Sequence, residues 1–265
     1  MRKIHAMGIV LLLIATFYSY KTVTADAASL SFGLKRAENE QPPDIGQQAE
    51  SLFDQFDVLY RDKSGEKVLY LTFDNGYENG QTTAILDTLK KEKIKATFFL
   101  TGHYLKSAPD YVKRMIAEGH TIGNHTYSHP TMPTLSDQQL AKELLSFDKE
   151  LFALTGITRT GIVRPPEGVY SEQTLRVANR LGYQHIFWSM AIVDWHEDRR
   201  RGKEVVTKEL VDQLHPGAII LLHTVTQDNS DALPLFIEEA KKRGYHFGEL
   251  EELRKQSVNT PIPFH

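Results

Sequence analysis

The feature that most constrains this fold is a repeated alternation between short, uninterrupted apolar runs and longer amphipathic segments. The apolar runs predict strands at residues 66–73, 95–100, 120–124, 161–164, 185–190, 218–222 and 245–247. The amphipathic segments predict helices at 47–60, 81–92, 109–118, 136–154, 171–181, 232–243 and 250–255. Apolar strands separated by helices are typical of a parallel sheet covered by helices. About seven such units in one domain favour an α/β fold of the closed or nearly closed (β/α) barrel type.

Composition excludes several kinds of protein. The chain has 265 residues, 41% of them hydrophobic, which is enough for one large domain with its own core. It has no cysteine, so disulfides, thiolate metal sites and a cysteine nucleophile are excluded. Its net charge of −3 gives no electrostatic case for a nucleic-acid partner.

The first residues have the pattern of a secretory signal peptide. A basic start, Met1 to His5, precedes an apolar run, and Ala25-Asp26-Ala27 is a small-x-small cleavage pattern. The alternative is an uncleaved membrane anchor, although the apolar run is shorter than the roughly 20 residues of a typical spanning helix. We therefore predict a signal peptide over 1–27, a lead-in with a packing helix over 28–65, one domain over 66–255 and a tail over 256–265. The protein is expected on the cell-wall side of the membrane.

Chemically capable side chains follow the predicted strands. They are Asp74, His125 with His129, Arg164, Asp194 with Trp195, and His223. In a β/α barrel the carboxyl ends of the strands share one face, where active sites lie. Convergence of so many residues on one rim predicts a catalytic site there, although each residue also has a purely structural interpretation.

Those structural interpretations stay open at this point. Asp74-Asn75-Gly76 has ordinary turn chemistry, and Arg164 can be a surface residue. On the rim, Arg164 would instead neutralise Asp74 and keep it ionised. His223 can be a satisfied core histidine, or a general acid whose imidazolium is held by Asp194.

The pair His125-x-x-x-His129 indicates a metal site. On a helical turn, two imidazoles four residues apart share a face and can chelate one cation, with Asp74 as an oxygen-bearing neighbour. Such a donor set suits zinc or another divalent first-row ion. The alternative is a solvent-facing pair. Trp195 is either core or the wall of a small apolar pocket.

In this order, the motifs resemble those of the polysaccharide deacetylase (NodB-homology, carbohydrate esterase) family. The motifs are Thr72-Phe73-Asp74-Asn75-Gly76, His125-Thr126-Tyr127-Ser128-His129, Arg164-Pro165-Pro166-Glu167-Gly168, Asp194-Trp195 and Leu221-Leu222-His223. The lead-in 32–44, the run 73–80 and His215-Pro216-Gly217-Ala218 look like the subgroup that deacetylates N-acetylmuramic acid in peptidoglycan, a step of muramic δ-lactam synthesis in the spore cortex.

The resemblance implies a deformed (β/α) barrel and hydrolysis of an N-acetyl group. Asp74 would be the general base, acting on a metal-bound water. Arg164 would tune Asp74, while His223 would protonate the leaving amine with Asp194 orienting it. His125, His129 and Asn75 would hold a divalent metal, with zinc expected. The substrate would contact Glu167, Trp195, Leu221 and Tyr77, the main chain near Glu167 would hold the oxyanion, and Leu221 and Trp195 would wall the acetate methyl.

Three positions depart from the usual family pattern. Asn75 replaces an aspartate that ligates metal, so the cation should be held more weakly. Glu167 replaces a tyrosine, and Ala191 replaces an aspartate of a longer Asp-x-x-Asp-Trp form.

The resemblance implies a secreted enzyme whose partner is the peptidoglycan glycan strand. One alternative is a deacetylase of N-acetylglucosamine polymers such as chitin or peptidoglycan, which shares every catalytic residue. Another is a glycan-binding module that has lost catalysis. A monomer is expected, with no protein partner.

Overall fold

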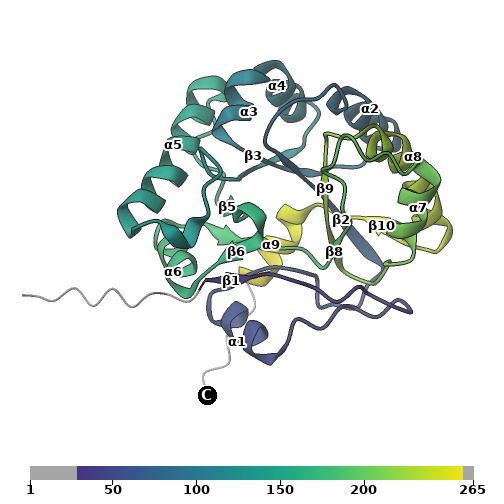
Figure 1. The fold of residues 1–265 in the computed structure, drawn as a ribbon, viewed down its shortest axis with the longest axis horizontal. Coiled ribbons are helices and arrows are strands. Elements are labelled where there is room, and N and C mark those ends of the chain that lie inside the picture. The colour runs from purple at the N-terminus through teal and green to yellow at the C-terminus, as the bar shows by residue number, and fades with distance from the viewer. Residues whose placement is uncertain (1–28, 259–265) are drawn as a thin grey trace, which may run out of the picture.

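The computed structural model describes residues 29–258 (Figure 1). The predicted signal peptide, the alternative membrane anchor and residues 259–265 of the predicted tail lie outside the described residues. The strands are β1 Leu30–Ser31, β2 Val68–Asn75, β3 Thr97–Leu100, β4 Thr121–Asn124, β5 Ile162–Val163, β6 Val169–Tyr170, β7 Gln184–His185, β8 Met190–Ala191, β9 Ala218–His223 and β10 His246–Phe247. The α-helices are α1 Gln47–Gln55, α2 Thr82–Glu92, α3 Gly102–Ser107, α4 Pro109–Ala117, α5 Asp137–Thr155, α6 Glu172–Arg180, α7 Lys203–Val211, α8 Gln227–Lys242 and α9 Leu250–Val258. Two short 3-10 helices cover Met132–Thr134 and Pro166–Gly168.

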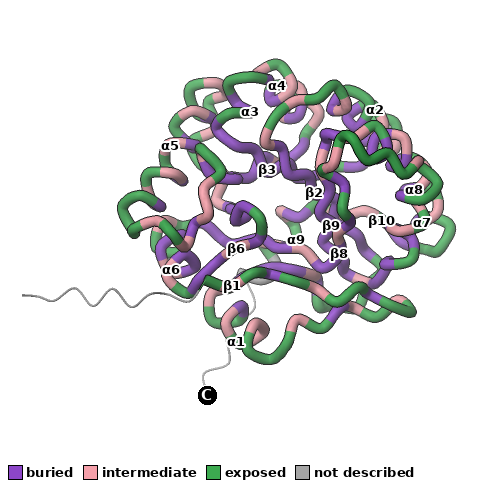
Figure 2. Tube along the Cα trace, in the orientation of Figure 1, coloured by how far each residue is buried: buried purple, intermediate pink, exposed green. Residues whose placement is uncertain are grey.

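The fold is a curled parallel sheet surrounded by helices. The strands follow the order β7-β5-β4-β3-β2-β9-β8, all neighbours are parallel, and β10 pairs with the start of β2. Figure 1 shows helices α2, α3, α4, α5, α7 and α8 around the outside of this curl, and in Figure 2 the strands are its buried part. The predicted single-domain α/β fold, a deformed barrel of about seven units, is confirmed.

Alternation along the central strand β2 directs its side chains to two different clusters. Leu69, Leu71 and Phe73 belong to the large cluster that contains α2 and α8 residues. Val68 and Tyr70 belong to a second cluster, which includes Leu250 and Leu253 of α9. Because successive side chains of a strand point to opposite faces, Asp74 shares the inner face with Tyr70, and Asn75 shares the outer face with Phe73.

The lead-in packs into the opening of the curl. Leu59 bridges Ile186, which follows β7, and Arg61 bridges Ala218 at the start of β9. The Asp62 amide donates to the carbonyl of Gly217 over 2.8 Å. Gly217 has φ +77°, and a Cβ placed there would lie 2.1 Å from the Asp62 carbonyl oxygen. Glycine is therefore required where the lead-in meets β9.

The predicted strand 185–190 is wrong in detail. The structure has β7 at Gln184–His185 and β8 at Met190–Ala191, with no strand over residues 186–189. The reason is a competing donor, since the Arg164 guanidinium bonds the carbonyls of Ile186 and Phe187, each over 3.1 Å. Carbonyls bound to a side chain do not continue a regular ladder.

Most predicted helix starts lie within one residue of the observed starts; the exception is α8, predicted from Ala232, which begins at Gln227. Ser136 with Gln139, and Ser171 with Thr174, form capping boxes at the predicted starts of α5 and α6. The first helix was predicted to reach residue 60, but α1 ends at Gln55. Helices α3 and α7 were not predicted. Between residues 29 and 258, no helix is both long and apolar enough to cross a membrane.

Candidate active site

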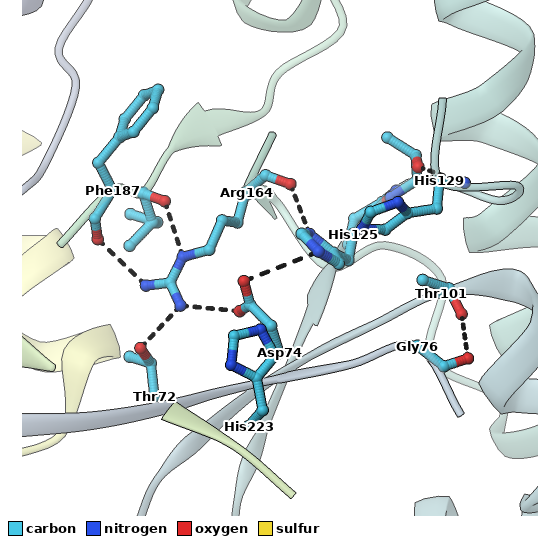
Figure 3. Close-up of polar contacts among 12 residues, drawn as sticks. Thr72, Asp74, Gly76, Thr101, His125, His129, Arg164, Phe187 and His223 are labelled. Carbon is cyan, nitrogen blue, oxygen red and sulfur yellow. Dashed lines mark hydrogen bonds and ion pairs between the residues drawn. The ribbon is translucent and has the colours of Figure 1, made fainter. Parts of the chain in front are cut away.

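The site is built around Asp74, at the end of β2. Its side chain is almost fully buried, and its Oδ1 accepts a hydrogen bond of 2.8 Å from Nη1 of Arg164. Its Oδ2 lies 3.7 Å from Nε2 of His125. Figure 3 shows Asp74 between these two side chains, with His223 beside it. The strand ends therefore bring a carboxylate, a guanidinium and two imidazoles together.

Arg164 holds Asp74 in the ionised form. Burial alone would raise the pKa of the carboxyl group, but the positive charge of Arg164, the largest opposing influence, holds that pKa below its ordinary value. Arg164 is fully buried, and its Nη1 also donates to Oγ1 of Thr72 over 2.8 Å. Together with the two main-chain carbonyls bound by its Nε and Nη2, these contacts fix the guanidinium in one position. A buried, ionised and positioned carboxylate is suited to accept a proton.

The second ion pair is His223 with Asp194. Nδ1 of His223, at the end of β9, lies 2.7 Å from Oδ1 of Asp194, in the loop after β8. Burial would lower the pKa of the imidazole, but the charge and hydrogen bond of Asp194 raise it above its ordinary value. With Nδ1 held by the carboxylate, Nε2 is the nitrogen that can give its proton to a substrate.

The two metal-binding histidines predicted from the sequence lie side by side, but not on a helix. Residues 125–130 form a loop in which Thr126 and His129 have positive φ angles. The rings of His125 and His129 are 4.9 Å apart between centroids. The carbonyl of Arg164 accepts from Nδ1 of His125 over 2.8 Å, so Nε2 carries the lone pair. Burial lowers the pKa of His125 to about 4, so the ring is neutral and able to ligate a cation.

Asn75, predicted as a metal ligand, lies on the other side of the sheet. Its side chain is fully buried and donates to Oγ1 of Thr224 over 2.5 Å, because the pleat of β2 turns it away from Asp74. Among residues 29–258, no group of three or more His, Asp or Glu side chains could hold a metal ion. Of the three predicted ligands, only the two imidazoles are placed to bind a divalent cation, so the predicted set is incomplete.

A cavity of about 850 Å³ opens over Asp74. All four residues predicted to contact substrate line it. Trp195 is 49% exposed, and its ring centroid lies 5.7 Å from that of His223. Leu221 is 7% exposed and offers an apolar surface. Tyr77 donates to Glu197 across the rim, and Glu167 has a left-handed backbone with φ 57°.

Several residues at the site were missed in the sequence. Trp188 and His103 line the cavity, and Thr72 and Asn229 bond the charged residues. Trp188 was hidden within a predicted strand. The segment Thr226-x-x-Asn229 offered one signal, since a threonine cap marks a helix start and the third residue after it lies in the first turn.

The sequence and the fold have known relatives. The model of the family described as polysaccharide deacetylase matches residues 61–186. The peptidoglycan-N-acetylmuramic acid deacetylase PdaA of Bacillus subtilis is 47% identical over 224 residues, 84% of this chain and 85% of PdaA. The chain belongs to the polysaccharide deacetylase family.

The structural comparison agrees with this assignment. The structure of Bacillus subtilis PdaA, a family 4 carbohydrate esterase, matches with a TM-score of 0.84 and 46% identity over 86% of this chain and 97% of that chain. A peptidoglycan-N-acetylglucosamine deacetylase of Bacillus cereus is 34% identical over 74% of this chain and 92% of its own length. Deacetylases of this family are generally metal-dependent, which sets the incomplete donor set of this chain apart.

Proposed function

We propose that the protein hydrolyses the N-acetyl group of N-acetylmuramic acid in peptidoglycan. The observation that carries this proposal is the meeting of two side chains at one cavity: Asp74, bonded to Arg164, which lowers its pKa, and His223, bonded to Asp194, which raises its pKa. Similarity over most of its length to an N-acetylmuramic acid deacetylase supports the choice of sugar. Deacetylation would allow muramic δ-lactam to form in the spore cortex.

The reaction uses the two groups in turn. Asp74 takes a proton from a water molecule, whose oxygen attacks the acetamide carbonyl carbon. Main-chain N–H groups near Glu167 stabilise the developing oxyanion. His223 then protonates the amide nitrogen, the carbon–nitrogen bond breaks, and acetate leaves while the sugar keeps a free amine. Leu221 and Trp195 enclose the acetyl methyl.

A divalent cation, zinc by our prediction, remains a separate proposal. His125 and His129 would contribute the ligands, and the place of Asn75 on the opposite face means weak binding. No step above depends on the cation. Direct titration of the protein with Zn²⁺, compared with His129→Ala, measures this binding.

The N-terminal sequence supports secretion to the cell-wall side of the membrane, where the glycan strand is the partner. Fractionation of expressing cells, with N-terminal sequencing of the exported protein, tests both export and cleavage after Ala27.

Acetate release from defined glycans tests the activity. Purified protein is incubated with peptide-free peptidoglycan strands, intact peptidoglycan and chitin oligosaccharides, and the products are weighed by mass spectrometry. We expect loss of acetyl from muramic acid residues, and further loss of water reports lactam closure. Release from N-acetylglucosamine polymers alone favours the alternative deacetylase supported by the Bacillus cereus relative. No release by the wild type with any divalent ion favours a glycan-binding module, whereas equal release by the wild type and Asp74→Asn contradicts Asp74 as the base.

A further inference from the structure

Asp194 is held by more than its histidine partner. Its Oδ1 accepts from the ring Nδ1 of His223 over 2.7 Å, and its Oδ2 accepts from the main-chain N–H of the same residue over 2.7 Å. One carboxylate thus grips both the ring and the backbone of the proton donor. The side chain of Asp194 is itself only 1% exposed.

Asn229 completes this arrangement from a third segment of the chain. Its Nδ2 donates to Oδ2 of Asp194 and also to the main-chain carbonyl of His223, the latter over 2.9 Å. Asn229 lies in the first turn of α8, where its own amide donates to the capping hydroxyl of Thr226 over 3.4 Å. The side-chain amide of Asn229 therefore connects α8 both to the end of β9 and to Asp194 in the loop after β8.

Asn229 does not line the cavity over Asp74. It lies instead on the far side of Asp194, where it borders a second cavity. Its role is therefore indirect. Each oxygen of the Asp194 carboxylate accepts one hydrogen bond from His223, and Asn229 adds a third donor that is anchored on a helix, so the carboxylate is restrained by a second element of the fold.

We infer that Asn229 is a positioning residue, which fixes Asp194 so that His223 delivers its proton along one direction. This inference rests on the proposed function. The proton donor is accordingly a three-residue array, His223–Asp194–Asn229, assembled from β9, the loop after β8 and α8. In Asn229→Ala the carboxylate loses one donor and the His223 carbonyl loses the hydrogen bond from the Asn229 amide.

The test compares Asn229→Ala with Ser230→Ala. Ser230 is the next residue of α8, is equally buried, and bonds Gln81 and Gln227 rather than the array. We expect Asn229→Ala to lower kcat for acetate release about tenfold with KM unchanged, a fraction of the roughly 10²–10⁴-fold that a positioned general acid contributes. Ser230→Ala should stay within about twofold of the wild type.

Two further readouts separate positioning from a general loss of structure. In an Asp194→Ala background, Asn229→Ala should have no additional effect on kcat, because its action passes through Asp194. With 4-nitrophenyl acetate, whose leaving group departs without a proton, Asn229→Ala should match the wild type. Independent effects of the two substitutions on kcat, or equal losses on both substrates, would overturn the inference.

A measurement that does not depend on acetate release tests the inference separately from the proposed function. The Nδ1–H of His223, bonded to a buried carboxylate, should give a downfield proton resonance that is slow to exchange with water. We expect that resonance in the wild type and Ser230→Ala, and its loss in Asn229→Ala. Its persistence unchanged in Asn229→Ala overturns the inference, whereas a protein that shows the expected loss but releases no acetate contradicts only the proposed function.

Discussion

Replacing Arg164 by methionine removes the cation that keeps Asp74 ionised while keeping a side chain of similar length. The two charges meet at 2.8 Å between Nη1 and Oδ1. Unit charges about 4 Å apart attract by about 4 kcal/mol at an effective dielectric constant of about 20. At 1.36 kcal/mol per unit, this corresponds to about 3 pKa units for Asp74.

The direction of the change in the pKa of Asp74 follows from the groups that remain around it. Without Arg164, burial is the largest influence on Asp74 and raises its pKa, while His125 and His223 lower it. Because the base must be deprotonated, activity falls as pH drops through the pKa of Asp74. We therefore expect the acid limb of the kcat/KM profile to move to higher pH by about 1–3 units in Arg164→Met.

The assay is acetate release across the pH range, with a thermal melt of each variant at each pH. Loss of one partner of a buried ion pair costs about 3–5 kcal/mol of stability, so the melt confirms that the protein measured is folded. Arg164→Lys is the matched control. It keeps the charge but loses the fork that bonds the carbonyls of Ile186 and Phe187, and its acid limb should move by less than that of the methionine variant. An acid limb that coincides with that of the wild type in folded Arg164→Met refutes the assignment of Asp74 as a base tuned by Arg164.

Other substitutions test the remaining parts of the structure. Asp194→Ala removes the charge that raises the pKa of His223 and leaves burial to lower it, so the basic limb of the kcat profile should move to lower pH; an unmoved limb contradicts His223 as the acid. Gly217→Ala should destabilise the protein by about 2 kcal/mol or more in urea unfolding, because of its positive φ and the contact with Asp62. Gly244 has φ +82°, and an added Cβ would meet nothing within 4 Å, so Gly244→Ala should lose only the stability that the backbone strain costs. Equal losses of stability in the two variants would argue against the close approach of Gly217 to Asp62. Asn75→Asp buries a carboxylate on the outer face, so we expect a loss of about 1–3 kcal/mol and an unchanged Zn²⁺ affinity by calorimetry; tighter binding would show that the side chain turns into the cavity.

The fold was predictable because its signals are local. Uninterrupted apolar runs and the serine caps at Ser136 and Ser171 identify strands and helix starts from neighbouring residues alone. The failure at residues 186–189 has a non-local cause. A guanidinium more than 20 residues earlier in the chain takes two of their carbonyls, and no propensity of Phe187 or Trp188 reports this.

The members of the site were predictable for a different reason. The carboxyl ends of parallel strands lie at one edge of the sheet. Polar residues that follow the apolar runs therefore come together there, regardless of how the helices pack. Which atoms face each other depends on long-range contacts. The sequence suggested a helical turn for His125 and His129, but two residues with positive φ bring the rings together in a loop instead. Asn229 lies 35 residues from Asp194, and no spacing rule joins the two.

Asp74 and Asn75 are adjacent in the sequence, but their side chains lie on opposite faces of the sheet. β2 runs through Asn75, so the alternation that turns Asp74 towards Arg164 must turn Asn75 towards Thr224. An aspartate at position 75 would have to break this alternation to meet the two imidazoles. An asparagine does not, because its amide finds a neutral partner on the outer face without the cost of a buried charge. Among the described residues, the charge state of the base thus depends chiefly on Arg164.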